Sequence, residues 1–125
     1  MTDALRRQIA EVSLVSCGEG VRWGALFAKR SLRIGWLGGS VTQGYANGRV
    51  QFETAFPALV AEELRKRGYT VENDICAEAG MDSMICGILA GETVLSHKPD
   101  LVFLEFAIND TTLRHNVHSF ESLLC

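Results

Sequence analysis

The feature that most constrains the fold is the near-continuous apolar run at 101–108, Leu-Val-Phe-Leu-Glu-Phe-Ala-Ile. A short run of this kind is typical of a parallel β-strand that is covered on both faces. A similar run spans 32–37 and ends at Gly38-Gly39, and a third, partly alternating run spans 70–77. Together these runs predict a parallel sheet.

Helical patterns separate the predicted strands. The stretch 54–64 carries apolar residues at helical spacing, with Pro57 in its first turn and Gly68 placed to end the helix. Asp82 or Ser83 can cap the next helix. The order strand, helix, strand, helix, strand predicts an α/β sandwich built from two right-handed crossover units.

The first thirty residues add two more helical patterns, at 3–12 and 21–30. A chain of 125 residues has room for one hydrophobic core. We therefore expect an N-terminal helical appendage over 1–31, followed by one α/β domain over 32–125.

Charge and composition exclude several classes of partner. The net charge is −3 and the pI is near 5.6, so the chain lacks the basic surface that nucleic acid requires. No apolar run approaches the ~20 residues that span a bilayer, and no secretory signal is visible. We expect no membrane association and a cytoplasmic location.

The four cysteines are scattered without the CxxC spacing of a zinc site or the pattern of a disulfide framework. They lie at positions 17, 76, 86 and 125. We expect reduced thiols that are mostly buried.

Each predicted strand ends in residues that could carry chemistry. The first is followed by Ser40, the second by a loop containing Gly80, and the third by Asn109-Asp110. Because ligands bind beyond the carboxyl ends of the strands in an open parallel sheet, these residues are expected to meet at one edge.

The residues around Ser40 do not match any of three known glycine-rich loop motifs. A P-loop would need Lys and Ser or Thr where Tyr45-Ala46 stand, a GxGxxG fingerprint is absent, and Thr42 occupies the second glycine of a GxSxG elbow. What remains is a serine with candidate donors at Gly80 and Asn109. Acyl transfer requires such a set, a nucleophile with donors aimed at the developing oxyanion.

The segments Gly38–Gly44 (GGSVTQG), Gly80 and Ala107–Asp110 (AIND) resemble the first three blocks of the SGNH, or GDSL-like, hydrolases. The resemblance implies a flavodoxin-like parallel sheet sandwiched by helices, and esterase or lipase activity without metal or cofactor. It implies that Ser40 is the nucleophile and an oxyanion donor, with the Gly80 N–H and the Asn109 side chain as further donors. Asp110 would help to hold the serine loop.

The chain departs from the family pattern in three places. Gly39, beside the serine, replaces the Asp of the GDS form, and Ala107 replaces a Gly; both variants occur in esterase-like branches. The family's DxxH motif, which supplies the base, is absent. We therefore expect the N-terminal portion of such a domain, with about three strands, acting on a small acyl ester; acetylated carbohydrate is a weaker candidate substrate.

Several alternatives remain open. Ser40 could be a turn residue, Gly80 could supply a positive φ angle, and Asn109 and Asp110 could cap the next segment. Without a base, the chain could be a binding module that keeps the pocket, or half of an assembled enzyme. An unpaired sheet edge would favour a homo-oligomer or a complementing chain.

Three other polar residues could also carry chemistry. His115 and His118 could offer a base or a metal pair, although a surface location is the simpler interpretation. Glu105, in an apolar strand, is expected to be hydrogen-bonded structure instead of a second acid.

Overall fold

The computed structural model describes residues 4, 23–110 and 123. The helix expected at 3–12 and the histidines at 115 and 118 lie outside the described residues, apart from residue 4. The elements from residue 23 onward are α2 (Trp23–Ala28), β1 (Ser31–Gly38), α3 (Ser40–Gln43), β2 (Tyr45–Ala46), β3 (Arg49–Val50), a 3-10 helix (Phe52–Thr54), α4 (Phe56–Lys66), β4 (Thr70–Ala77), α5 (Ser83–Thr93), a second 3-10 helix (Leu95–His97) and β5 (Leu101–Glu105).

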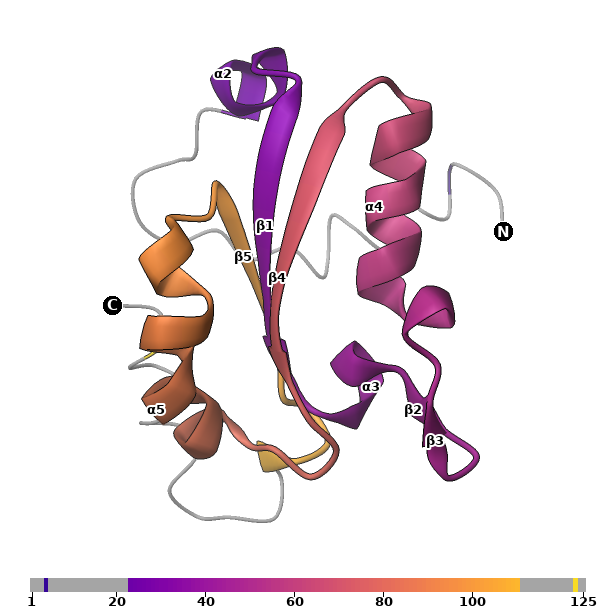
Figure 1. Ribbon diagram of the computed structural model, residues 1–125, viewed down its shortest axis with the longest axis vertical. Coiled ribbons are helices and arrows are strands. Elements are labelled where there is room, and N and C mark those ends of the chain that lie inside the picture. The colour runs from indigo at the N-terminus through magenta and orange to yellow at the C-terminus, as the bar shows by residue number, and fades with distance from the viewer. Residues whose placement is uncertain (1–3, 5–22, 111–122, 124–125) are drawn as a thin grey trace.

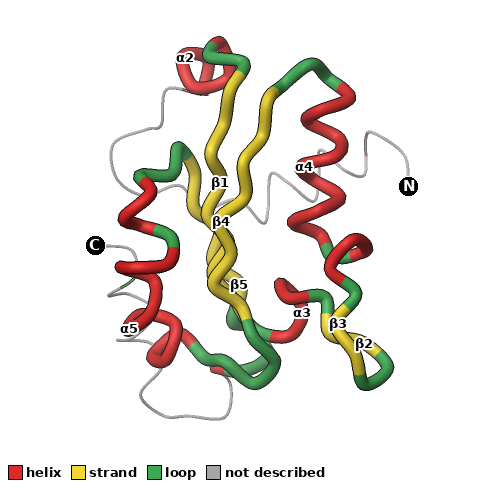
Figure 2. The backbone as a smooth tube through the Cα atoms, in the orientation of Figure 1, coloured by secondary structure: helices red, strands yellow, loops and turns green. Residues whose placement is uncertain are grey.

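Three parallel strands form the main sheet, in the order β4-β1-β5. The first crossover, through α4, leads from β1 to β4, and the second, through α5, returns past β1 to β5. Because the two steps run in opposite directions, the same handedness places the helices on opposite faces. Figure 1 shows α4 and α5 on the two sides of the sheet, and Figure 2 shows the same arrangement as a backbone tube. The predicted parallel sheet flanked by helices is confirmed.

The helix boundaries follow the predicted signals. Pro57 lies in the first turn of α4, and Gly68, with φ of 84°, adopts the left-handed conformation just beyond its end. Asp82 caps α5, because its side chain accepts a hydrogen bond from the backbone N–H of Ile85 at 2.9 Å.

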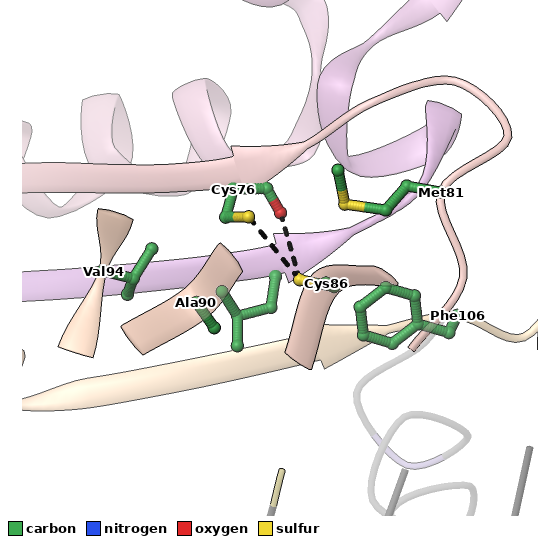
Figure 3. Close-up of a cluster of buried hydrophobic side chains, with 7 residues drawn as sticks. Cys76, Met81, Cys86, Ala90, Val94 and Phe106 are labelled. Atoms are coloured by element: carbon green, nitrogen blue, oxygen red, sulfur yellow. Dashed lines mark hydrogen bonds between the residues drawn. The ribbon is translucent and has the colours of Figure 1, made fainter. Parts of the chain in front are cut away.

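The two faces of the sheet bury separate hydrophobic clusters. The cluster on the α4 face consists of Leu26, Leu32, Ile34, Trp36, Ala61 and Val71. The cluster on the α5 face consists of Leu37, Cys76, Met81, Cys86, Ala90, Val94 and Phe106, most of which are labelled in Figure 3. Strand β1 contributes to both clusters, as the alternation of side chains along a strand requires.

The third strand differs from its prediction. It ends at Glu105 instead of Ile108, and it is not covered on both faces, since Val102 is 40% and Phe103 44% exposed. The reason lies in its position: within the described residues β5 is an edge strand, and the two long helices pack mainly over β4 and β1.

A small hairpin, β2–β3, was missed by the sequence analysis. Its turn is Asn47-Gly48, and both residues have positive φ angles, 53° and 77°. Asn-Gly is the preferred pair for a two-residue hairpin turn, so the signal was present.

None of the described helices combines the length and the apolar content that a bilayer crossing requires.

Candidate active site

Ser40 occupies the carboxyl end of the central strand. It is the first residue of the short helix α3, directly after β1 and Gly39. The chain leaves β1 toward β4 on one side and reaches β5 on the other, so this end of β1 and β5 is the switch point of the sheet. Figure 1 shows α3 at the strand ends.

Close packing demands glycine at both positions before the serine. A Cβ atom on Gly39 would lie 2.6 Å from Nδ2 of Asn109 and 3.2 Å from the carbonyl oxygen of Met81. A Cβ atom on Gly38 would overlap the Thr42 side chain. The glycines therefore allow the Asn109 amide and the serine turn to approach the strand end directly.

The Asn109 side chain joins the third predicted block, to which it belongs, to the first. Its Nδ2 donates a hydrogen bond to the carbonyl oxygen of Met81 at 2.5 Å. The same amide lies against Gly39, which places it next to the residue that precedes Ser40.

Ser40 and Asn109 line one narrow hollow at the carboxyl ends of β1 and β5. Its interior has no room for a water molecule. The lining residues are Gly39, Ser40, Val41, Glu105, Phe106, Ile108 and Asn109. Thus the structure brings together the serine and asparagine blocks that the sequence separates by almost seventy residues.

Gly80 lies in the neighbouring loop. It has a positive φ of 85° and lines a second hollow, with Glu78, Ala79, Met81 and Ile85, instead of the one that Ser40 lines. The loop is nevertheless tied to α3, because the backbone N–H of Ala79 donates to Oε1 of Gln43 at 3.0 Å. The role of Gly80 as an oxyanion donor stays a prediction.

The Asp110 carboxylate has a partner on another segment. Its Oδ1 accepts a hydrogen bond from the backbone N–H of Ser83 at 2.9 Å. This bond holds the start of α5. Asp110 therefore supports the loop that carries Gly80. The expected role of Asp110 in holding the serine loop stays a prediction.

Glu105 is hydrogen-bonded, as expected. Its carboxylate accepts from the backbone N–H of Ala107 at 3.2 Å and from the hydroxyl of buried Thr42 at 3.5 Å. Thr42 and Gln43 are supporting residues that the sequence analysis missed. Nothing in a single sequence separates such polar residues from ordinary turn residues.

The described residues place no histidine in the Ser40 hollow. Nδ1 of His97 lies 2.9 Å from Oδ1 of Asp74, whose backbone pairs with Gly35 well before the strand ends. Within the same residues, no group of three or more His, Cys, Asp or Glu side chains could hold a metal ion.

No protein-family model matches the chain, and no curated protein does. Solved structures do match. Two are of a two-domain esterase (CEX) active on acetylated mannans, one of them co-crystallized with mannopentaose; they are 26% and 27% identical to the chain, with TM-scores of 0.67 and 0.71. Each match covers 82% of this chain and 29% of the esterase.

A third structure is the lipase/acylhydrolase from Enterococcus faecalis, 25% identical, with a TM-score of 0.60. The match covers 74% of this chain and 48% of that one. The chain thus spans less than half the length of these proteins. The likenesses support the SGNH/GDSL-like resemblance carried by the motifs, and the chain has an esterase-type fold.

Proposed function

We propose that the chain carries the nucleophile of a serine ester hydrolase, with Ser40 in that role. The observation that carries the proposal is the contact of the Asn109 amide with Gly39, directly beside Ser40. A hydroxyl at a strand end with an amide donor next to it is the arrangement that acyl transfer requires.

In the proposed reaction, Oγ of Ser40 attacks the ester carbonyl while a base takes its proton. The carbonyl oxygen becomes an anion, and the backbone N–H groups of Ser40 and Gly80 and the side chain of Asn109 stabilise it. The alcohol leaves with the proton, and water then releases the acyl group from Ser40. The reaction needs no metal or organic cofactor.

The base is supplied from outside the described residues, either by this chain or by another polypeptide. His97 is engaged with Asp74, away from the Ser40 hollow. This observation also favours a second candidate function, a binding module that keeps the pocket without catalysis. The two candidates differ in whether Ser40 becomes acylated.

The substrate we propose is a small acyl ester. Acetylated carbohydrate is one candidate class, because one of the similar structures is an esterase active on acetylated mannans. The exposed mouth of the Ser40 hollow would suit a substrate whose alcohol portion remains outside.

We further propose that the outer edge of β5 pairs with a strand from a second copy or from a complementing chain. The supporting observations are the edge position of β5 among the described strands and the exposure of Val102 and Phe103. Sedimentation velocity of the purified chain is expected to show a dimer or larger species. A compact monomer would contradict this proposal.

Ester hydrolysis tests the function directly. The chain, alone and with any copurifying partner, is assayed on 4-nitrophenyl acetate and on acetylated manno-oligosaccharides. Ser40→Ala is expected to reduce hydrolysis to the uncatalysed rate, while Ser31→Ala, an exposed serine at the start of β1, leaves it unchanged. Equal hydrolysis by wild type and Ser40→Ala would overturn the assignment.

A further inference from the structure

Two cysteines face each other inside the cluster on the α5 face of the sheet. The sulfur atoms of Cys76, on β4, and Cys86, on α5, are 3.7 Å apart. Both are free thiols, with 6% and 0% of the residue exposed. Figure 3 shows the Cys86 sulfur directed at both the sulfur and the carbonyl oxygen of Cys76.

The two cysteines lie at the two ends of the loop that belongs to the candidate site. Residues 77–85 connect the two cysteines, and they include Gly80 and Met81. This segment makes the bonds already described to Gln43, Asn109 and Asp110. A covalent link between the cysteines would therefore close a ring around the loop that lies beside Ser40.

We propose that Cys76 and Cys86 are a thiol–disulfide pair, which a small-molecule disulfide such as oxidised glutathione converts into a bridge between β4 and α5. The inference does not depend on the proposed esterase function. It rests on the contact of the two sulfurs and on their positions at the two ends of one loop.

The exchange balances in two steps. The Cys76 thiolate attacks one sulfur of the small disulfide, and the first small thiol leaves. The Cys86 thiolate then attacks the Cys76 sulfur of the mixed disulfide, and the second small thiol leaves. Two protein thiols are oxidised to one disulfide, the small disulfide is reduced to two thiols, and the protons pass to those thiols.

The fold controls the rate of this exchange. Burial, together with the neighbouring Cys76, raises the pKa of the Cys86 thiol to about 12. The thiolate is the attacking species, so the closed structure reacts slowly at neutral pH. The sulfurs must also approach from 3.7 Å to about 2.05 Å, which draws the first turn of α5 toward β4.

The test compares the bridge in folded and unfolded chains. A Cys17→Ser, Cys125→Ser variant keeps only the proposed pair and is equilibrated in glutathione redox buffers, with and without urea. Alkylation, intact mass and peptide mapping then measure the fraction bridged. Because proximity in the fold favours the bond, its equilibrium constant is expected to be at least about tenfold larger in the folded chain, about 30 mV in reduction potential.

Two results would overturn the inference. One is an equal or smaller constant in the folded chain, and the other is a glutathione adduct on Cys76 that persists without a bridge. Cys86→Ser in the same background is the matched control and must show no loss of two hydrogen atoms. Should the serine background fail to fold, peptide mapping of the wild-type chain still reports whether a 76–86 link forms.

Discussion

The two ends of the main sheet are built from different interactions. At the carboxyl end, Gly38 and Gly39 let neutral groups approach the backbone, and hydrogen bonds of Asn109 and Thr42 hold the turn around Ser40. The amino-terminal half instead carries ionic contacts. They join Arg33 to Glu72 and Asp74, Asp74 to His97, and Lys29 to Asp100.

The ionic contacts stabilise the scaffold, and they lie apart from the candidate active site at the carboxyl end. The Arg33 pairs link β1 to β4, and the Lys29–Asp100 pair joins the residues just before β1 and β5, far along the strands from Ser40. They occupy His97, the only histidine among the described residues, in a contact with Asp74. Substitutions at the carboxyl end should therefore affect both Ser40 and stability, whereas those at the amino end should affect stability alone.

The largest effect is expected for Gly39→Ala. The added methyl group would collide with the Asn109 amide and the Met81 carbonyl, so the free energy of unfolding should fall by about 1–3 kcal/mol. Reactivity of Ser40 should be lost as well. Urea unfolding and active-site labelling measure the two effects.

Gly91→Ala is the control for that substitution. Gly91 lies within α5, and nothing lies within 4 Å of its added Cβ, so helix propensity should raise stability by at most about 1 kcal/mol. A Gly39→Ala variant as stable and as reactive as wild type would show that the close approach at Gly39 is unimportant.

Asn109→Ala removes the hydrogen bond to the Met81 carbonyl, and the loss of a bond to a buried residue should cost about 1–2 kcal/mol of stability. If Asn109 also donates to the oxyanion, ester turnover should fall about a hundredfold or more. Asn73→Ala is the matched amide control, because Asn73 accepts from Nε1 of Trp36 at 3.0 Å, away from the Ser40 hollow. Equal turnover in the two variants would remove Asn109 from the proposed machinery.

Thr42→Val tests the bond between α3 and the end of β5. The Thr42 side chain is buried, but its hydroxyl is 3.5 Å from the Glu105 carboxylate, so a loss of only about 0.5–1 kcal/mol is expected. Thr93→Val, on the exposed side of α5, should change stability by less than about 0.5 kcal/mol. Chemical denaturation of both variants checks the difference, and an equal effect would show that the Thr42 bond adds nothing.

Asp100→Asn should have the smallest effect, at the opposite end of the sheet. The hydrogen bond from Lys29, and then that from the Arg33 backbone N–H, lower the pKa of the Asp100 carboxyl. Its stabilisation is therefore present above the unfolded pKa of about 3.9 and is lost as the pH falls through the lower folded value.

The variant should lose less than about 0.5 kcal/mol at neutral pH, because the pair is partly exposed, and still less at high salt. The difference from wild type should shrink in acid. Thermal unfolding between neutral and acidic pH measures it, and a difference that grows as the pH falls would contradict the assignment.

Local signals in the sequence were sufficient to predict most of the strands and helices of the sheet scaffold. The apolar run before Gly38, Pro57 and Gly68 around α4, and the capping Asp82 act within a few residues, and each was confirmed. The meeting of the Ser40 and Asn109 segments was also predictable, because parallel strands direct their carboxyl ends to one edge.

The individual side-chain contacts between distant segments, and the exposure of each strand, were not predictable. An apolar run does not reveal how much cover a strand receives, so the exposure of Val102 and Phe103 depended on where the helices pack. The Asn109 bond to the Met81 carbonyl and the proximity of Cys76 and Cys86 likewise follow from the order of strands in space.

Labelling of the purified chain with a fluorophosphonate probe tests the role of Ser40 most directly. Intact-mass and peptide mass spectrometry should find one adduct, on Ser40, that is absent from Ser40→Ala and retained in Ser31→Ala. An unlabelled Ser40 in a folded sample, with any copurifying partner present, would contradict its assignment as an activated nucleophile.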